Sequence, residues 1–90
     1  MIVKVRYFGS LREITKRFEE HITLPEGATL TELLKSLEQR YGKRFSNYVF
    51  EKGRIADDVL ISVNRRYERN LKRRLRHNDD IAIMPVVGGG

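Results

Sequence analysis

The sequence lacks cysteine altogether. It therefore offers no disulfide, no thiolate nucleophile and no thiolate ligand for a metal. It also lacks any run of 18 apolar residues, so no segment is predicted to span a membrane. No basic start followed by an apolar stretch indicates a signal peptide. Because export signals are absent, we expect the protein to be cytoplasmic.

Histidine is also scarce, and His21 and His77 are the only two in the chain. We expect both to lie on the surface, because two histidines lack a third ligand at any familiar spacing. The pairs Asp57–Asp58 and Asp79–Asp80 are typical of turns. We therefore expect no metal site and no self-sufficient catalytic site. A chain of 90 residues makes one domain with a single small core, which leaves no room for a deep active site.

The patterns that are present begin with alternation of apolar and polar residues. Residues 1–8 place Val3, Val5 and Tyr7 on one face and Phe8 among charged residues on the other, which predicts a half-buried strand. Similar alternation predicts strands at 19–24, 59–64 and 81–84, with Ala82 and Met84 facing outward. The connections at 11–18 and 43–58 are predicted to be irregular or briefly helical.

A helix is predicted over residues 29–41. Thr29 and Glu32 form a capping box, and Gly42 is a typical stop. Its apolar residues recur at helical spacing and predict a stripe that covers a sheet, which indicates the α+β class. We expect the first and last strands to be neighbours at the centre of that sheet. The stripe consists of Leu30, Leu33, Leu34, Leu37 and Tyr41.

The formal net charge is +6, and residues 65–76 carry all of it. Seven cations in this segment face only Glu68, and the remainder of the chain is balanced. Such a run indicates either a solvated face, a surface for an acidic partner or a surface for nucleic acid. A nucleic-acid partner is the least favoured of the three. The cations are Arg65, Arg66, Arg69, Lys72, Arg73, Arg74 and Arg76.

The chain ends on Pro85-Val-Val and three glycines. Proline cannot donate a ladder hydrogen bond, so regular pairing should stop at Pro85. Glycine contributes no side chain to a core and resists ordering. We therefore expect a folded domain over residues 1–84 and a flexible tail over residues 85–90.

Several of these stretches together resemble the MoaD family, the small subunits of molybdopterin synthase within the MoaD/ThiS superfamily of sulfur carriers. They are Val-Arg-Tyr-Phe-Gly-Ser-Leu-Arg-Glu-Ile at 5–14, the capped helix, Val63-Asn64, and the stretch at 79–90 with its aspartates, aliphatic strand, proline and terminal glycines. The resemblance covers essentially the whole chain, although family members are often acidic and this chain is basic at 65–76. It implies a ubiquitin-like β-grasp fold, with a mixed sheet of four to five strands covered by one main helix.

The resemblance also implies an activity that resides at the C-terminus. An E1-like enzyme of the MoaB, MoeB or ThiF type would use ATP to adenylate the Gly90 carboxylate, which then becomes a thiocarboxylate. Gly88 and Gly89 would let the tail thread into the partner. Sulfur would pass to cyclic pyranopterin monophosphate, in the synthesis of the molybdenum or tungsten cofactor. The chain itself would bind no cofactor and would be the non-catalytic subunit of a heterotetramer with a large subunit of the MoaE type.

Position-by-position matching implies that Phe8, Tyr67 and Met84 form the partner-binding patch on one sheet face near the tail. The alternative is that these are scattered surface residues, which are common. Other functions stay open at this point. They are a ubiquitin-like modifier joined through Gly90 to lysines, a sulfur carrier for tRNA thiolation or thiamin synthesis, and a small basic RNA-binding domain with an inert tail.

Overall fold

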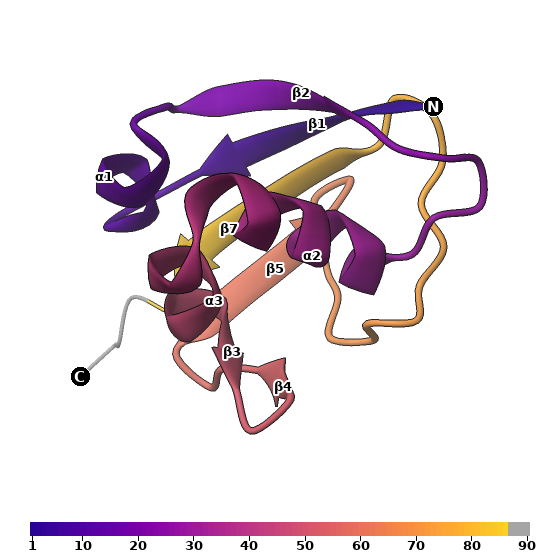
Figure 1. Cartoon of the computed structure of the whole chain (residues 1–90). Coiled ribbons are helices and arrows are strands. Elements are labelled where there is room, and N and C mark those ends of the chain that lie inside the picture. The colour runs from indigo at the N-terminus through magenta and orange to yellow at the C-terminus, as the bar shows by residue number, and fades with distance from the viewer. Residues whose placement is uncertain (87–90) are drawn as a thin grey trace.

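The structure is a computed structural model that describes residues 1–86, so the predictions for Gly88, Gly89 and Gly90 lie outside the described residues. Figure 1 shows the order of the elements along the chain. They are β1 (Ile2–Tyr7), α1 (Leu11–Thr15), β2 (Glu19–Thr23), α2 (Leu30–Tyr41), α3 (Lys43–Val49), β3 (Phe50–Glu51), β4 (Arg54–Ile55), β5 (Val59–Val63), β6 (Arg66–Tyr67) and β7 (Asp80–Pro85).

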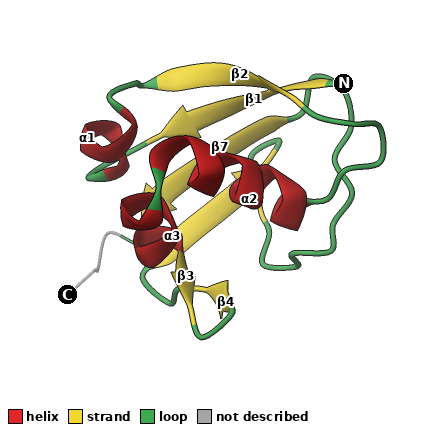
Figure 2. Ribbon diagram, viewed as in Figure 1, coloured by secondary structure: helices red, strands yellow, loops and turns green. Residues whose placement is uncertain are grey.

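The sheet is mixed and has five strands in the order β2-β1-β7-β5-β6 (Figure 2). β1 and β7 run parallel, whereas β1–β2, β5–β7 and β5–β6 are antiparallel. The first and last strands are therefore central neighbours, as the sequence predicted. A separate two-stranded hairpin is made by β3 and β4.

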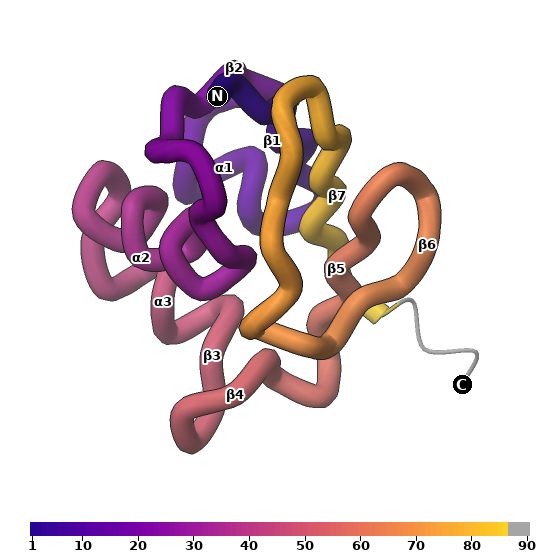
Figure 3. The backbone as a smooth tube through the Cα atoms, turned by 90° about the vertical axis from the view of Figure 1, so that its right-hand side faces the viewer, coloured from indigo at the N-terminus to yellow at the C-terminus, as the bar shows by residue number. Residues whose placement is uncertain are grey.

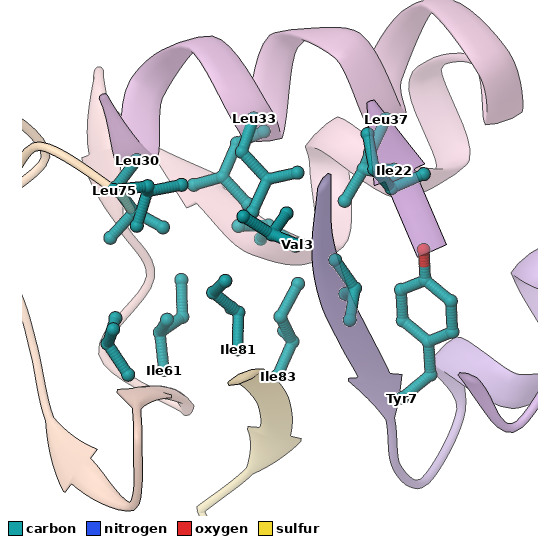
Figure 4. Close-up of a cluster of buried hydrophobic side chains, with 14 of the residues drawn as sticks. Val3, Tyr7, Ile22, Leu30, Leu33, Leu37, Ile61, Leu75, Ile81 and Ile83 are labelled. Atoms are coloured by element: carbon teal, nitrogen blue, oxygen red, sulfur yellow. The ribbon is translucent and has the colours of Figure 1, made fainter. Parts of the chain in front are cut away.

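Helix α2 lies across one face of the sheet and packs its buried leucines against the inward side chains of the strands (Figure 4). Thr29 caps it, because its Oγ1 accepts a hydrogen bond from the Glu32 N–H at 3.4 Å. Four leucines of α2 are fully buried, and burying one such side chain contributes about 1.5–3 kcal/mol. They meet the inward residues of the strands, which the alternation predicted correctly. This inner face includes Val3, Val5, Tyr7, Ile22, Ile61, Ile81 and Ile83, with Leu75 from the basic segment.

The stretch at 43–58 is more ordered than predicted. Helix α3 begins directly after Gly42, and its Phe45 and Val49 are fully buried. A tight hairpin follows, with its turn at Lys52-Gly53. The sequence signal was weak because α3 has only two core positions and each hairpin strand has two residues, too few to establish a period.

Ala82 is fully buried, although its predicted outward position is correct by register. It lies between Arg6 of β1 and Ser62 of β5 on the outer face. Its methyl group is shorter than the side chains beside it, and β7 is a central strand, so neighbours shield it. The outer face is therefore closed at its centre, and its accessible apolar groups lie further toward the strand ends.

A buried carboxylate joins the far end of α2 to the sheet. The side chain of Glu20 in β2 is only 6% exposed. It accepts hydrogen bonds from the Tyr7 hydroxyl at 2.5 Å, from the Tyr41 hydroxyl and from Arg40 at 2.9 Å. Burial and the hydrogen bond to Glu20 raise the pKa of both tyrosines above the usual value of 10.0. In this network the buried carboxylate and both tyrosine hydroxyls have hydrogen-bond partners, which matters most at a site of low dielectric constant.

The loop at Gly9 packs against the end of β7. Gly9 has a φ of +62°, and a Cβ placed there would come within 2.9 Å of Pro85 Cγ. The prediction that pairing stops before Pro85 is wrong, because β7 includes Pro85, which is paired with Val59, and the Val86 N–H donates to Asp58 O at 2.9 Å. Proline lacks only the N–H donor, so it can remain in a strand where that donor is not needed. The Gly9 backbone therefore leaves room for the proline ring, and this contact fixes where the chain leaves the sheet.

The Glu20 network predicts that the protein loses stability at high pH. The pKa of Tyr7 is higher in the folded state than in the unfolded state, so its contribution is complete below about pH 10 and is lost as the pH rises above that value. Denaturant titrations between pH 8 and 11 should show this loss. Tyr7→Phe removes the titrating group and should show a shallower decline. At pH 7 it should be about 1–3 kcal/mol less stable, because Glu20 loses a donor. An equally steep decline in Tyr7→Phe would contradict this account.

The packing of Pro85 on Gly9 predicts that Gly9→Ala is destabilising for two reasons, backbone strain and a steric clash. Gly53→Ala is a matched control, because Gly53 has a φ of +78° and nothing within 4 Å of an added Cβ. The control should cost about 1–2 kcal/mol from strain alone. Gly9→Ala should cost at least about 1 kcal/mol more from overpacking. Equal free energies of unfolding for the two variants would show that the proline contact contributes nothing.

Candidate functional site: the strand ends and the outer-face patch

The site begins with the parallel pairing of β1 and β7. Because the strands are parallel, their carboxyl ends lie at the same edge of the sheet. Tyr7 pairs with Ile83, and the Phe8 N–H donates to Ile83 O at 3.1 Å. Phe8 therefore lies beside the last residues of β7. β1 and β7 lie side by side, so the chain leaves the sheet beside the end of the first strand (Figure 1).

Strand register brings the three predicted partner-binding residues onto one face. Met84 is opposite Leu60 in β5, and Phe8 follows β1 on the other side of β7. Tyr67 is opposite Ser62, two residues along β5 from Leu60 and on the same face. The side chain of Tyr67 is 74% exposed, and Phe8, Leu60 and Met84 are half-buried. We call Phe8, Leu60, Tyr67 and Met84 the outer-face patch.

Leu60 was not among the residues predicted for the site. The signal was available, because Val59 and Ile61 were predicted to face inward and Leu60 lies between them. Leu60, like Phe8, is an apolar residue on the outward face of its strand. Pairing with β7, which periodicity does not reveal, is what places Leu60 next to Met84.

Two arginines hold the Phe8 ring. The guanidinium carbons of Arg6 and Arg12 lie 5.7 and 5.1 Å from its centroid, within the range of cation–π attraction. Arg6 Nε donates to Asp80 Oδ1 at 2.9 Å, and Arg12 Nε donates to Tyr7 O at 2.9 Å. Both cations are therefore fixed by the chain itself. This arrangement explains how a large ring is accommodated on the charged face.

Arg12 also contacts a second exposed ring. Its guanidinium carbon lies 4.5 Å from the centroid of Phe18, which is 68% exposed. Phe18 lies in the connection before β2, where no periodic pattern gave it a place. Sequence reasoning missed it because only the fold of the α1 loop brings it to the arginine that contacts Phe8.

The described residues offer little chemistry of their own. No group of three or more histidine, aspartate or glutamate side chains gathers within residues 1–86. His21 is exposed, and His77 is exposed with its Nδ1 accepting the Ile2 N–H at 3.0 Å. A cavity of about 490 Å³ lies away from the strand ends, between α2 and the β3–β4 hairpin. It is lined by Thr31, Lys35, Glu38, Phe50, Gly53, Leu71 and Lys72.

Within residues 1–86, no helix has both the length and the apolar character needed to cross a membrane.

Comparison with known proteins identifies the family. The sequence model that describes the ThiS family matches residues 5–90 of the chain. No curated protein matches the sequence. The solved structures that resemble the chain include a candidate molybdopterin converting factor subunit 1 from Pyrococcus furiosus. It is 36% identical, with a TM-score of 0.82, and the match covers 97% of this chain and 99% of that one.

Two further structures resemble the chain over nearly its whole length. Small archaeal modifier protein 1 from Methanosarcina acetivorans is 29% identical, with a TM-score of 0.82 and coverage of 99% and 96%. A complex of subunits 1 and 2 of the molybdopterin-converting factor from Helicobacter pylori gives 26% identity, a TM-score of 0.67 and full coverage of both chains. These likenesses confirm the β-grasp fold. The chain therefore belongs to the ThiS family, and it is a ubiquitin-like sulfur carrier of the ThiS and MoaD type.

Proposed function

We propose that the chain is the sulfur-carrying small subunit of a molybdopterin synthase and that Gly90 is its working residue. The observation that carries the proposal is the arrangement at the strand ends, where the chain leaves the sheet beside the outer-face patch. The 36% identity to the Pyrococcus furiosus protein supports this route among those open to the family. In this role the folded domain presents the tail, and partner proteins carry out the reactions.

The chemistry requires outside activation. A terminal carboxyl has a pKa near about 3.5 and is an anion at neutral pH, so it is a poor electrophile. In the proposed route the Gly90 carboxylate attacks the α-phosphate of ATP on an E1-like enzyme and pyrophosphate leaves. A sulfur nucleophile at the oxidation level of sulfide then displaces AMP and leaves a thiocarboxylate. The sequence has no cysteine, so the sulfur must come from a partner.

Transfer then returns the carrier to its starting state. Within a large subunit of the MoaE type, the thiocarboxylate sulfur attacks a carbon of cyclic pyranopterin monophosphate and displaces an oxygen substituent of that carbon. Water hydrolyses the resulting thioester, which releases the sulfur on the acceptor and regenerates the Gly90 carboxylate. The structure of subunits 1 and 2 from Helicobacter pylori is a precedent within the fold for such a pairing. Glycine at Gly88, Gly89 and Gly90 lets the backbone pass where side chains would clash.

The outer-face patch supplies the proposed docking surface for both partners. Aromatic residues and methionine are enriched in protein interfaces, and the patch combines Phe8, Tyr67 and Met84 with an aliphatic neighbour. Its place beside the exit of the chain means that a partner covering the patch would also face the tail. The same surface would serve the activating enzyme and the large subunit in turn.

A second candidate is a protein modifier joined through Gly90 to lysines. The observation that favours it is the 29% identity to the archaeal modifier protein from Methanosarcina acetivorans, over 99% of the chain. Adenylation of Gly90 is common to both candidates. They differ in the nucleophile that displaces AMP from the acyl group, which is a sulfide-level sulfur for the carrier and a lysine amine for the modifier.

The proposed function predicts a mass change that depends on the tail. With an E1-like enzyme, ATP and sulfide, the intact mass of the chain should rise by the difference between sulfur and oxygen. The product should then sulfurate cyclic pyranopterin monophosphate in the presence of a large subunit. Gly89→Val should lower the rate of adenylation about 100-fold, because a branched side chain displaces the reacting carboxylate. Its melting temperature should not change.

The controls separate the candidates. A chain that lacks Gly89 and Gly90 should gain no mass under any of these conditions. Lysine-linked adducts of the intact chain, without sulfur transfer to the pterin, would instead favour the modifier. An equal loss of adenylation and of thermal stability in Gly89→Val would contradict a specific role for the tail.

The patch predicts a defect in docking that is separable from folding. Phe8→Ala should raise the KM of the chain in the adenylation assay by roughly tenfold, as expected for a central interface anchor. Ile2→Ala is the matched control, because Ile2 is an exposed apolar residue on the same face of β1 at its other end. The control should leave KM unchanged. If both variants raise KM equally, or if neither does, the patch is not the docking surface.

A further inference from the structure

The basic segment at 65–76 is only partly used by the fold. Arg73 forms an ion pair with Glu68 at 3.0 Å, and this pair lowers the pKa of Glu68. Arg69 reaches Asp57 at 3.8 Å and donates to a backbone carbonyl. These two arginines therefore help to hold the loop in place.

The other five cations in the segment have no such role. All are exposed, and within residues 1–86 none forms an ion pair or a side-chain hydrogen bond. They are Arg65, Arg66, Lys72, Arg74 and Arg76. Arg65 and Arg66 are nonetheless placed by the pairing of β6 with β5. The loop that carries the other three cations is held to the start of α2 by backbone hydrogen bonds through Leu71 O, Arg73 O and the Leu75 N–H. The charges are therefore held in place without partners.

One of these residues occupies a backbone position that does not suit it. The turns of the β3–β4 and β5–β6 hairpins each have two residues with positive φ, as a type I′ turn requires. The first turn holds Lys52 and Gly53, at +54° and +78°. The second holds Asn64 and Arg65, at +53° and +69°. Asparagine and glycine favour this turn, whereas arginine rarely adopts a positive φ. Arg65 therefore occupies a backbone position that disfavours its side chain, as Lys52 does in the first turn. What distinguishes Arg65 from Lys52 is its place on the hairpin that carries Tyr67.

The β5–β6 turn adjoins the proposed docking surface on its Tyr67 side, at the end of β7 opposite to the one where the chain leaves the sheet. β6 forms the edge of the sheet beyond β5 (Figure 3). Its Tyr67 belongs to the outer-face patch. Arg66 precedes Tyr67 and is paired with the inward-facing Val63, so its side chain leaves this edge strand on the opposite face. A protein that covers the patch and extends past this edge would meet Arg65 and Arg66. An apolar contact with a charged rim is the usual anatomy of a protein interface.

These observations favour a protein partner over a nucleic acid. Arginine binds carboxylates and phosphates alike through its planar fork. Single-stranded nucleic acid is bound by several stacking aromatics along a basic groove, and only Tyr67 lies exposed next to these arginines. Leu60 and Met84 are half-buried apolar residues of the patch, and apolar side chains do not bind the phosphate backbone of a nucleic acid.

We propose that Arg65 and Arg66, at the tip of the β5–β6 hairpin, bind carboxylates on the rim of the activating enzyme while the outer-face patch makes the apolar contact. The inference rests on the proposed function and names the chemistry of the partner at this edge. The activating enzyme is the partner that both candidates for the proposed function share, because each begins with adenylation of Gly90.

The test compares two variants with the same change in net charge. Arg65→Gly with Arg66→Gln removes the tip charges and places glycine where the turn favours it. Lys52→Asn with Arg54→Gln removes two charges from the β3–β4 hairpin, where neither side chain has an ion pair within the described chain. Pyrophosphate release by the E1-like enzyme is measured against carrier concentration at low and high salt.

The tip variant should have a KM roughly fivefold to tenfold higher at low salt, from the loss of two exposed charge pairs, and a weaker dependence on salt. Its melting temperature should be equal to or above that of the unchanged chain. The control variant should keep both the KM and the salt dependence. Adenylation of the unchanged chain with no difference between the variants would overturn the inference and leave the proposed function intact.

Two further outcomes would lead to different conclusions. No adenylation of the unchanged chain would contradict the proposed function itself. Total tRNA serves as the second probe, in a binding assay at the same salt concentrations. The unchanged chain could bind tRNA while the tip variant does not, with the same KM for both in the adenylation assay. That result would assign the hairpin tip to a nucleic acid and would overturn the proposal of an acidic protein partner.

Discussion

The parallel pairing of β1 with β7 is the constraint on which the rest of the structure depends. It makes the first and last strands the centre of the sheet, with residues such as Val5 and Ile81 fully buried between α2 and the outer face. It also brings the carboxyl ends of both strands to one edge. The end of the chain therefore leaves from the most constrained part of the domain. Gly9 and Pro85 secure this exit, since the missing side chain of one accommodates the ring of the other.

A domain without cysteine suits the proposed reaction at the chain terminus, in which partners supply the chemistry. The core and the Glu20 network fix the frame, while the described residues bring no cluster of metal ligands together. Because activation and sulfur must come from partners in the proposed route, the domain's contribution is to be recognised and to present its end in a defined place. Binding energy at the patch can then be used to position a remote carboxylate.

Much of this could be predicted from the sequence. Alternation gave the strands and their inward faces, the Thr29–Glu32 box gave the start of α2, and apolar matching gave the central strand pair. Elements of two residues carry no period, so β3, β4 and β6 were missed. Leu60 and Phe18 enter the site only through pairing and loop geometry. The Glu20 network joins β1, β2 and α2, and no local pattern reveals a contact among three elements.

The charges near the site divide into two kinds, and the division bears on how a partner would bind. Arg6 and Arg12 are held by Asp80 and by a backbone carbonyl, so they support the Phe8 ring and have less capacity to attract a partner. The tip arginines have no partner within the described chain and lie at an edge. Charges at a rim act mainly on the rate of encounter, whereas a desolvated apolar patch acts mainly on dissociation. A carrier that must visit an activating enzyme and then leave it benefits from this separation, because attraction at the rim speeds capture without deepening the apolar contact.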